Sequence, residues 1–285
     1  MRLGDLTVHV FADTTFRLDG GAIFGVVPRV LWERVKPPDE KNRILMTSHC
    51  LLVESGDRLV LVDAGLGDKL DAKEREIFDV PDGEARLPDR LAEAGCRVEE
   101  VTDVVLTHLH FDHCGWSTRR EGDRWAPTFP RARYWIQRDE LHHARHPNVR
   151  DRVSYDSRNF EPLLDEGSVE LFDEEAEPAP GIRAVRAPGH TRGMSIVLLD
   201  GGDSAKGVFL ADLVPTAAHL STPWVMGYDL FPVETMESKE RWLPRAAREG
   251  WVCFLQHDPE MPGARLVEEG SGRYRAEPLD PELLD

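Results

Sequence analysis

The segment VVLTHLHFDHCGW, residues 104–116, carries three histidines and an aspartate within six positions, directly after an apolar run. Imidazole nitrogens and carboxylate oxygens are ligands of borderline divalent metals such as zinc. Because side chains just past a strand end cannot all point the same way on regular structure, we expect a tight loop and a helix start here. Such a loop can aim His108 and His110 at one point while Asp112 and His113 face a second. The segment therefore indicates a metal site rather than an ordinary polar loop.

Three further polar side chains each follow a predicted strand. His190 lies between Pro and Gly residues in APGHTRG, Asp212 ends the apolar strand VFLAD, and His257 ends CFLQHD. Each one alone has an ordinary explanation. His190 could be a loop histidine, Asp212 could cap a turn, and His257 could be bonded to a backbone carbonyl. Taken with the cluster, they complete a set of candidate metal ligands.

The segments around these residues alternate between strand and helix patterns. Residues 49–67 predict two apolar strands joined by Ser-Gly-Asp, LPDRLAEAGC predicts an amphipathic helix, and VTDVVLTHLH predicts a buried strand. The second half repeats this order with a strand in GIRAVRAPGH, a hairpin turning at Gly201 and Gly202, a helix in SKERWLPRAAREG and a strand in WVCFLQHD. Strands flanked by helices in both halves predict an α/β layered domain. We expect EEAEPAPG to be a surface linker and the stretch from Pro262 onward to be loosely held.

Length and composition limit the classes of protein to which this chain can belong. A chain of 285 residues with 41% hydrophobic residues can fold as one domain, and its apolar runs are far shorter than the roughly 20 residues of a membrane span. The formal net charge of -17 repels polyanions such as nucleic acid, so a neutral or apolar small substrate fits better. The N-terminal MRLGDLTVHVFADTTF lacks signal-peptide features and predicts a strand of a cytoplasmic protein. The four scattered cysteines predict reduced thiols.

The order of these motifs resembles the metallo-β-lactamase superfamily. Asp63 in LVDAGLG comes first, then the HxHxDH cluster, His190, Asp212 and His257, and the resemblance covers about residues 5 to 260. It implies a four-layer αββα sandwich, formed by residues 1–285 as a single domain with two similar halves, about 1–165 and 166–285. The metals would lie at the edge where the strand-end loops converge.

The resemblance also implies a role for each residue. One divalent ion takes His108, His110 and His190, while Asp112, His113 and His257 hold the second. Asp212 bridges the two ions, Asp63 orients ligands from behind, and Asp112 and Asp212 are the expected catalytic carboxylates. The ions are expected to be zinc, with Mn, Fe or Co as alternatives, and to share a hydroxide that opens a lactone or carboxylic ester. No GxSxG motif and no P-loop competes with this interpretation.

Four segments look most like the branch that contains quorum-quenching N-acyl homoserine lactonases and methyl parathion hydrolase. They are LDGGAIFGVVPRVLW, THLHFDHCGW, FPRARYWIQRDE and LADLVPTAAHL. An N-acyl homoserine lactone is therefore the expected substrate, and a phosphotriester or phosphoester is the alternative. Some lactonases of this branch have a tyrosine three residues after the bridging aspartate, where this chain has Pro215. Either Tyr228 or His219 takes its place, or the substrate differs.

Other residues have two possible roles. Phe111 either lines the substrate pocket or packs beneath the loop. The aromatic Phe24 and Trp32, with Met46, form either a lid over an apolar substrate or part of the core, and the Pro and Gly residues between them favour the lid. The histidines of LHHARHP (His142, His143, His146) fit a solvated helix end better than an ion site. A homodimer is a possible assembly.

Overall fold

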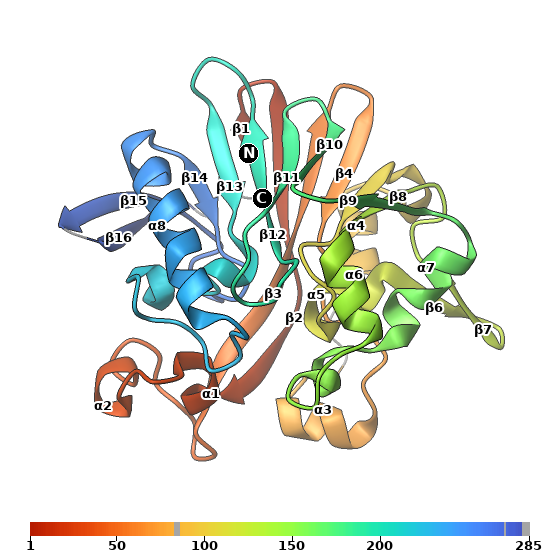
Figure 1. Ribbon diagram of the computed structural model, residues 1–285. Coiled ribbons are helices and arrows are strands. Elements are labelled where there is room, and N and C mark those ends of the chain that lie inside the picture. Colours follow the sequence, from red (N-terminus) through yellow and green to blue (C-terminus); the bar gives the residue numbers. More distant parts are fainter. Residues whose placement is uncertain (83–85, 271, 281–285) are drawn as a thin grey trace.

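A computed structural model describes residues 1–82, 86–270 and 272–280 (Figure 1). The N-terminal half forms a seven-stranded sheet in the order β1-β2-β3-β4-β5-β8-β9. Its strands are β1 Arg2–Leu3, β2 Leu6–Asp19, β3 Arg43–Ser55, β4 Arg58–Val62, β5 Asp103–Val105, β8 Arg133–Gln137 and β9 Val169–Phe172.

The C-terminal half forms a second seven-stranded sheet, in the order β10-β11-β12-β13-β14-β15-β16. Its strands are β10 Glu175–Ala179, β11 Ile182–Arg186, β12 Ser195–Asp200, β13 Lys206–Phe209, β14 Val252–Phe254, β15 Gly263–Gly270 and β16 Arg273–Pro278. A small separate ribbon pairs β6 Thr118–Glu121 with β7 Arg124–Pro127.

Eight α-helices and six 3-10 turns connect the strands in the described part of the chain. The helices are α1 Gly20–Phe24, α2 Arg29–Trp32, α3 Ala72–Phe78, α4 Leu87–Glu93, α5 Phe111–Cys114, α6 Arg138–Arg145, α7 Glu161–Asp165 and α8 Pro232–Arg248. The turns are η1 Val98–Glu100, η2 Gly115–Ser117, η3 Arg152–Ser154, η4 Ser157–Asn159, η5 Ala211–Leu213 and η6 Ala217–Leu220. None of the described helices is long and apolar enough to cross a bilayer.

The two sheets pack face to face between outer layers of helices. Val53 and Val62 of the first sheet share one buried cluster with Val197 and Phe209 of the second. On the outer faces, α4, α6 and α7 cover the first sheet and α8 covers the second (Figure 1). Central strands are apolar on both faces because both are covered. The predicted αββα sandwich is thus the observed architecture.

Two expectations about the ends of the halves were wrong. The expected linker EEAEPAPG contains β10, which pairs antiparallel with β11, and the stretch after Pro262 forms the antiparallel pair β15 and β16. Backbone hydrogen bonds order these strands, and few apolar side chains in the sequence indicate them. The first sheet also continues through Phe172, beyond residue 165. The four cysteines are free, as expected of reduced thiols, and all four are buried.

Candidate metal centre

The candidate ligands lie where strands of the two sheets end. Asp63 directly follows β4, His108 follows β5, and His190 follows β11. Asp212 lies in η5 just after β13, and His257 follows β14. Because neighbouring strands of a layered fold end along one edge, the loops that follow them can meet there. The polar residues at these positions therefore lie outside the strands, in loops that meet at one edge of the sheets.

The HxHxDH segment forms the loop and helix start that its spacing predicted. His110 is the N-cap of the short helix α5, and the His113 amide donates to the His110 carbonyl at 3.0 Å. Gly115 follows at a very close approach to the preceding loop, where an added Cβ would lie 2.0 Å from the Leu66 carbonyl oxygen. Only glycine allows the backbone to come this near.

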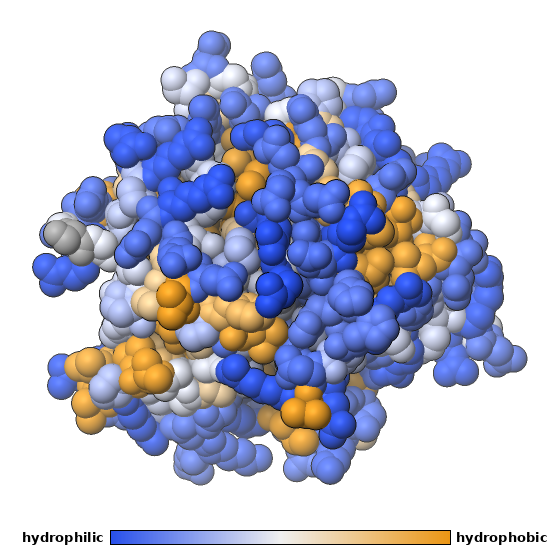
Figure 2. All heavy atoms as spheres, in the orientation of Figure 1, coloured by the Kyte–Doolittle hydropathy of each residue, from blue (hydrophilic) through white to orange (hydrophobic). Residues whose placement is uncertain are grey.

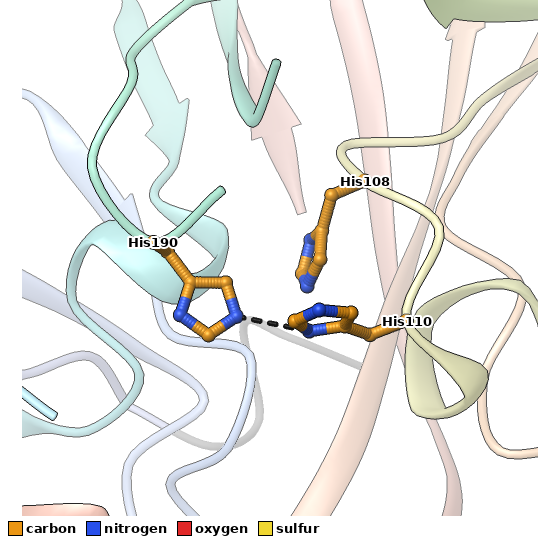
Figure 3. Close-up of side chains that lie close together, drawn as sticks. All are labelled: His108, His110 and His190. Carbon is orange, nitrogen blue, oxygen red and sulfur yellow. Dashed lines mark hydrogen bonds between the residues drawn. The ribbon is translucent and has the colours of Figure 1, made fainter. Parts of the chain in front are cut away.

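One group of possible ligands consists of three histidines. Ring nitrogens of His108, His110 and His190 all lie within 4.8 Å of one another. His190 Nε2 faces His110 Nδ1 at 3.0 Å (Figure 3). His108 Nε2 is buried and has no hydrogen-bond partner among the described residues. Burial, with the neighbouring ligand histidines, holds the pKa of both His108 and His110 well below the ordinary value. Both rings are therefore neutral, which is the form that binds metals.

A second group lies beside the first. Ligand atoms of Asp112, His113 and His257 also lie within 4.8 Å of one another. His257 Nε2 faces His113 Nε2 at 3.1 Å and lies 3.7 Å from Asp112 Oδ2. These atoms are two nitrogens and one carboxylate, a donor set suited to a borderline divalent ion.

The Asp212 carboxylate reaches both groups. Its Oδ2 lies 3.1 Å from His190 Nε2, and its Oδ1 lies 3.0 Å from His257 Nε2. Burial opposes ionisation, but the histidines around it hold the pKa of Asp212 well below its ordinary value. The facing ring nitrogens, the partnerless His108 Nε2 and this shared anion fit two divalent cations better than they fit a set of hydrogen bonds among themselves.

The outer ring nitrogens of three histidines are fixed by acceptors. His113 Nδ1 donates to Asp63 Oδ2 (2.8 Å), and His190 Nδ1 donates to Asp229 Oδ1 (2.9 Å). His257 Nδ1 donates to a backbone carbonyl at 2.7 Å. These bonds orient the rings and select the tautomer that leaves Nε2 free for a cation. Asp63, the predicted supporting carboxylate, is one of these acceptors.

Two carboxylates near the site carry no signal in the sequence. Asp229 belongs to a loop without a strand-end or motif signal. Glu140, on α6, accepts from the Leu109 amide (3.0 Å) and from Thr191 Oγ1 (2.5 Å). It therefore joins the HxHxDH loop to the loop of His190, and burial raises its pKa. Its fully buried position in a helix of polar residues was not marked in the sequence.

A cavity of about 410 Å³ opens beside the two groups of ligands. Five of the seven candidate ligands line it, together with Tyr228 and an apolar set of Leu18, Ile23, Met46, Leu70, Ile77, Phe78, Phe111, Val153, Met226 and Leu230. Phe111 thus lines the pocket, and its ring stacks on Phe78 at 5.4 Å. Figure 2 shows several groups of apolar side chains on the lower part of this face, over the α1–α2 segment, toward the centre above it and over α3.

Three candidate pocket residues lie elsewhere. Phe24 and Trp32 do not line the cavity, because they stack at 5.2 Å inside a buried cluster beneath it. The lid prediction for them is wrong. His219 is also buried outside the cavity, where its ring nitrogens contact Thr216 Oγ1 (2.9 Å) and the Ile23 carbonyl (3.1 Å). It cannot replace the missing tyrosine.

The histidines of α6 divide into two kinds. His142 and His146 are exposed, as expected for a solvated helix end. His143 differs from that expectation, because it is half-buried and its Nε2 donates to Asp151 Oδ2 at 2.6 Å. The sequence of the helix alone could not reveal a partner on the next loop.

Known proteins that are similar to this chain include two probable metal-dependent hydrolases. A probable metallo-hydrolase of Mycobacterium tuberculosis is 32% identical over 183 residues, which are 56% of this chain and 54% of that protein. This chain thus matches about half the length of that relative. The structure of a probable metal-dependent hydrolase from Staphylococcus aureus has a TM-score of 0.88 and 30% identity, and covers 97% of this chain and 99% of that one.

A third similarity is one of fold. The structure of AidC, a dizinc quorum-quenching lactonase with its product N-hexanoyl-L-homoserine, has a TM-score of 0.79 at 20% identity, covering 98% of this chain and 96% of that one. The family model described as the metallo-beta-lactamase superfamily matches residues 44–257. With this match over most of its length, the chain belongs to the metallo-β-lactamase superfamily.

Proposed function

We propose that this protein is a dinuclear metal-dependent hydrolase that opens lactones with an apolar acyl tail, such as an N-acyl homoserine lactone. The observation that carries the proposal is the pair of ligand groups that share the Asp212 carboxylate on the wall of an apolar cavity. Their donor atoms suit two zinc ions. Such ions, when bound, act as Lewis acids and supply a hydroxide near neutral pH.

His108, His110 and His190 would hold one ion, and Asp112, His113 and His257 the other, with Asp212 between them. Three acceptors behind the rings support this assignment, because they leave the inner nitrogens free.

The other residues of the cavity would bind and orient the substrate. Asp112 and Asp212 both line the cavity, where the Asp112 carboxylate can hold a proton beside the reacting ester while the Asp212 carboxylate stays ionised between the ligand groups. Tyr228 also lines it, and burial raises its pKa to about 12, so its hydroxyl stays protonated and can donate to a substrate carbonyl. We propose Tyr228 for the role that Pro215 cannot fill. Phe111 and its apolar neighbours would enclose the acyl tail.

The three similar proteins support this proposal from two directions. The Mycobacterium and Staphylococcus proteins bear the names of metal-dependent hydrolases, and AidC shares the fold and carries two zinc ions. Two of these names are given as probable activities, and for the present chain all three similarities motivate a direct test.

The test combines metal analysis with a substrate panel. Purified active protein should hold about two ions per chain, and N-acyl homoserine lactones should be hydrolysed with a higher kcat/KM than aryl esters, phosphotriesters, phosphodiesters or β-lactams. One ion or none in active protein would contradict the dinuclear assignment. Faster turnover of a phosphotriester would favour the alternative hydrolase on the same site.

A further inference from the structure

We infer that Asp13 is a positioning residue for the metal centre, because it fixes the loop after Asp63 against the segment that carries His113. The inference rests on the proposed function in one respect, since it concerns the ion that Asp112, His113 and His257 would hold. It goes beyond that function by assigning a residue of β2 that belongs to none of the ligand groups and does not line the cavity.

Asp13 lies at an irregularity of β2. The register between β2 and β3 shifts between Ala12 and Thr15, and a bulge of this kind re-aims the side chains next to it. The Asp13 side chain is fully buried there. A buried carboxylate is costly unless its oxygens are hydrogen-bonded, so the partners of Asp13 explain why it is tolerated at this position.

Four N–H groups donate to the Asp13 carboxylate. Its Oδ2 accepts from the backbone amides of Leu66 (2.9 Å) and Gly67 (3.2 Å). Its Oδ1 accepts from the Leu87 amide (2.7 Å) and from Trp116 Nε1 (2.8 Å). Burial raises the pKa of this carboxyl, and hydrogen bonds from its partners oppose the rise. Because all four partners are donors, the ionised carboxylate fits this site, whereas an amide of the same shape would turn its NH₂ group toward other donors.

The bonds of Asp13 join two segments that are also paired through their backbones. The Ala64 amide donates to the His113 carbonyl at 2.6 Å, and the Gly115 amide donates to the Gly65 carbonyl at 2.7 Å. The residues after β4 are thereby held against α5 and η2, so the position of one segment sets the position of the other. Asp13 adds a buried charge that binds donors from both.

Asp63, at the start of the first segment, depends on such support. Its backbone has a φ of 58°, in the left-handed region, although it is not a glycine. A residue stays in this conformation when the surrounding structure holds it there. In this conformation its carboxylate accepts from the Thr107 amide (2.8 Å) and from His113 Nδ1 (2.8 Å). Without the Asp13 bonds the loop can relax, and the acceptor that orients the His113 ring moves with it.

Asp13→Asn tests this role, because it keeps the shape of the side chain and replaces one acceptor with a donor. The affinity for one of the two ions should fall about tenfold, the lower end of the effect of losing a supporting group, since Asp13 acts through Asp63. Competition with a chromophoric chelator measures both affinities in the zinc-loaded protein. Trp116→Phe removes a single donor from the same carboxylate, so it should cause a smaller change in the same direction.

A spectroscopic signal identifies the ligand that is affected. The ring N–H groups of His113 and His190 are buried against Asp63 and Asp229, so each should give a slowly exchanging proton signal in the zinc-loaded protein. Asp229→Ala assigns the two signals, because it removes the acceptor of His190 alone. In Asp13→Asn and in Trp116→Phe, the His113 signal should shift and exchange faster with solvent, while the His190 signal stays in place.

Asp103→Asn is the matched control. Asp103 is also fully buried, and its carboxylate accepts from Trp135 Nε1 (2.9 Å) and pairs with Arg133 (3.1 Å). It is the first residue of β5, whereas His108 follows the other end of that strand. This variant should lower the melting temperature, as Asp13→Asn does, and should leave both ion affinities and the His113 signal unchanged.

Unchanged affinities and an unchanged His113 signal in Asp13→Asn would overturn the inference, and Trp116→Phe decides in the same way if Asp13→Asn does not fold. The same changes in Asp103→Asn would also overturn it, because they would then report a general loss of stability. Lactone hydrolysis by the wild type is measured in parallel. Its absence would reject the proposed function and leave the assignment of Asp13 standing, since neither readout depends on turnover, whereas hydrolysis with an unaltered His113 signal in the variants would do the reverse.

Discussion

His190 Nδ1 donates to Asp229 Oδ1 at 2.9 Å, and both side chains are buried. Asp229 is 39 residues further along the chain, and its other oxygen accepts from the Met226 amide at 3.3 Å. This bond fixes the protonated nitrogen of His190 on the side away from the ligand group. The free Nε2 then faces His110 and Asp212.

Asp229→Ala should weaken metal binding at the three-histidine group. Without the acceptor, His190 loses its fixed tautomer and ring orientation, so affinity for that ion should fall about 10- to 100-fold. Competition with a chromophoric chelator measures this affinity. His142→Ala serves as the control, because His142 is an exposed histidine that belongs to none of the ligand groups. Equal affinities in both variants would show that Asp229 does not support the site.

Asp212→Ala should reduce both metal content and turnover. The two ligand groups share this carboxylate, and without it two cations would face each other with no anion between them. We expect a fall from about two ions per chain to one or fewer, together with a loss of most of the activity. Elemental analysis and lactone hydrolysis on the same sample provide the measurement. Full activity in this variant would refute the bridging role.

Lys239 should make the stability depend on pH. It is buried in α8, its Nζ donates to the carbonyls of His219 (2.9 Å) and Trp224 (2.6 Å), and burial lowers its pKa to about 7 from the usual 10.5. Between these values the unfolded chain holds a proton that the folded chain lacks. The free energy of unfolding should therefore rise with pH above about 7, by up to about 1.4 kcal/mol per unit, and this contribution should be constant below it.

Replacing Lys239 with Met removes this contribution. Urea unfolding at pH 7, 8 and 9 should show that the stability difference between wild type and Lys239→Met grows with pH in favour of the wild type. The exposed Lys73 of α3 supplies the control, and Lys73→Met should follow the wild-type curve. Parallel curves for wild type and Lys239→Met would mean that the lysine stays protonated when folded.

The sequence predicted those parts of the site that follow strand ends. A buried strand is recognisable from its apolar run, and a polar residue at its end marks the sheet edge, so His190, Asp212 and His257 could be found together. Asp229 could not, because only the tertiary fold brings its loop to His190. The same holds for Asp13, whose donors come from segments far apart in the sequence.

The N-terminal segment shows a second limit. Pro and Gly residues correctly indicated a loop-rich stretch, but they do not determine which way an aromatic side chain faces. Trp32 turns inward over Gly20, where an added Cβ would lie 2.5 Å from the indole ring. Because Gly20 has no side chain, the Trp32 ring can pack into the core and does not cover the cavity. The edge strand β16 was not predicted either. Its residues are mostly polar, and it is ordered by backbone hydrogen bonds to β15.

Phe111 should make hydrolysis depend on the length of the acyl tail. Its ring lines the cavity next to the ligand groups and is supported by Phe78. Each tail methylene buried against this wall contributes about 0.8 kcal/mol, which is about fourfold in kcat/KM. Wild-type kcat/KM should therefore rise along a series of acyl homoserine lactones until the cavity is filled.

Phe111→Ala removes much of this wall, so KM should increase most for the long-tailed substrates and the rise with chain length should flatten. Leu171→Ala is the matched truncation, because Leu171 is exposed on β9 outside the cavity and should leave the series unchanged. The measurement is kcat/KM across the series for the three proteins. If the slopes of wild type and Phe111→Ala coincide, the acyl tail binds elsewhere, and the apolar wall of the cavity has another role.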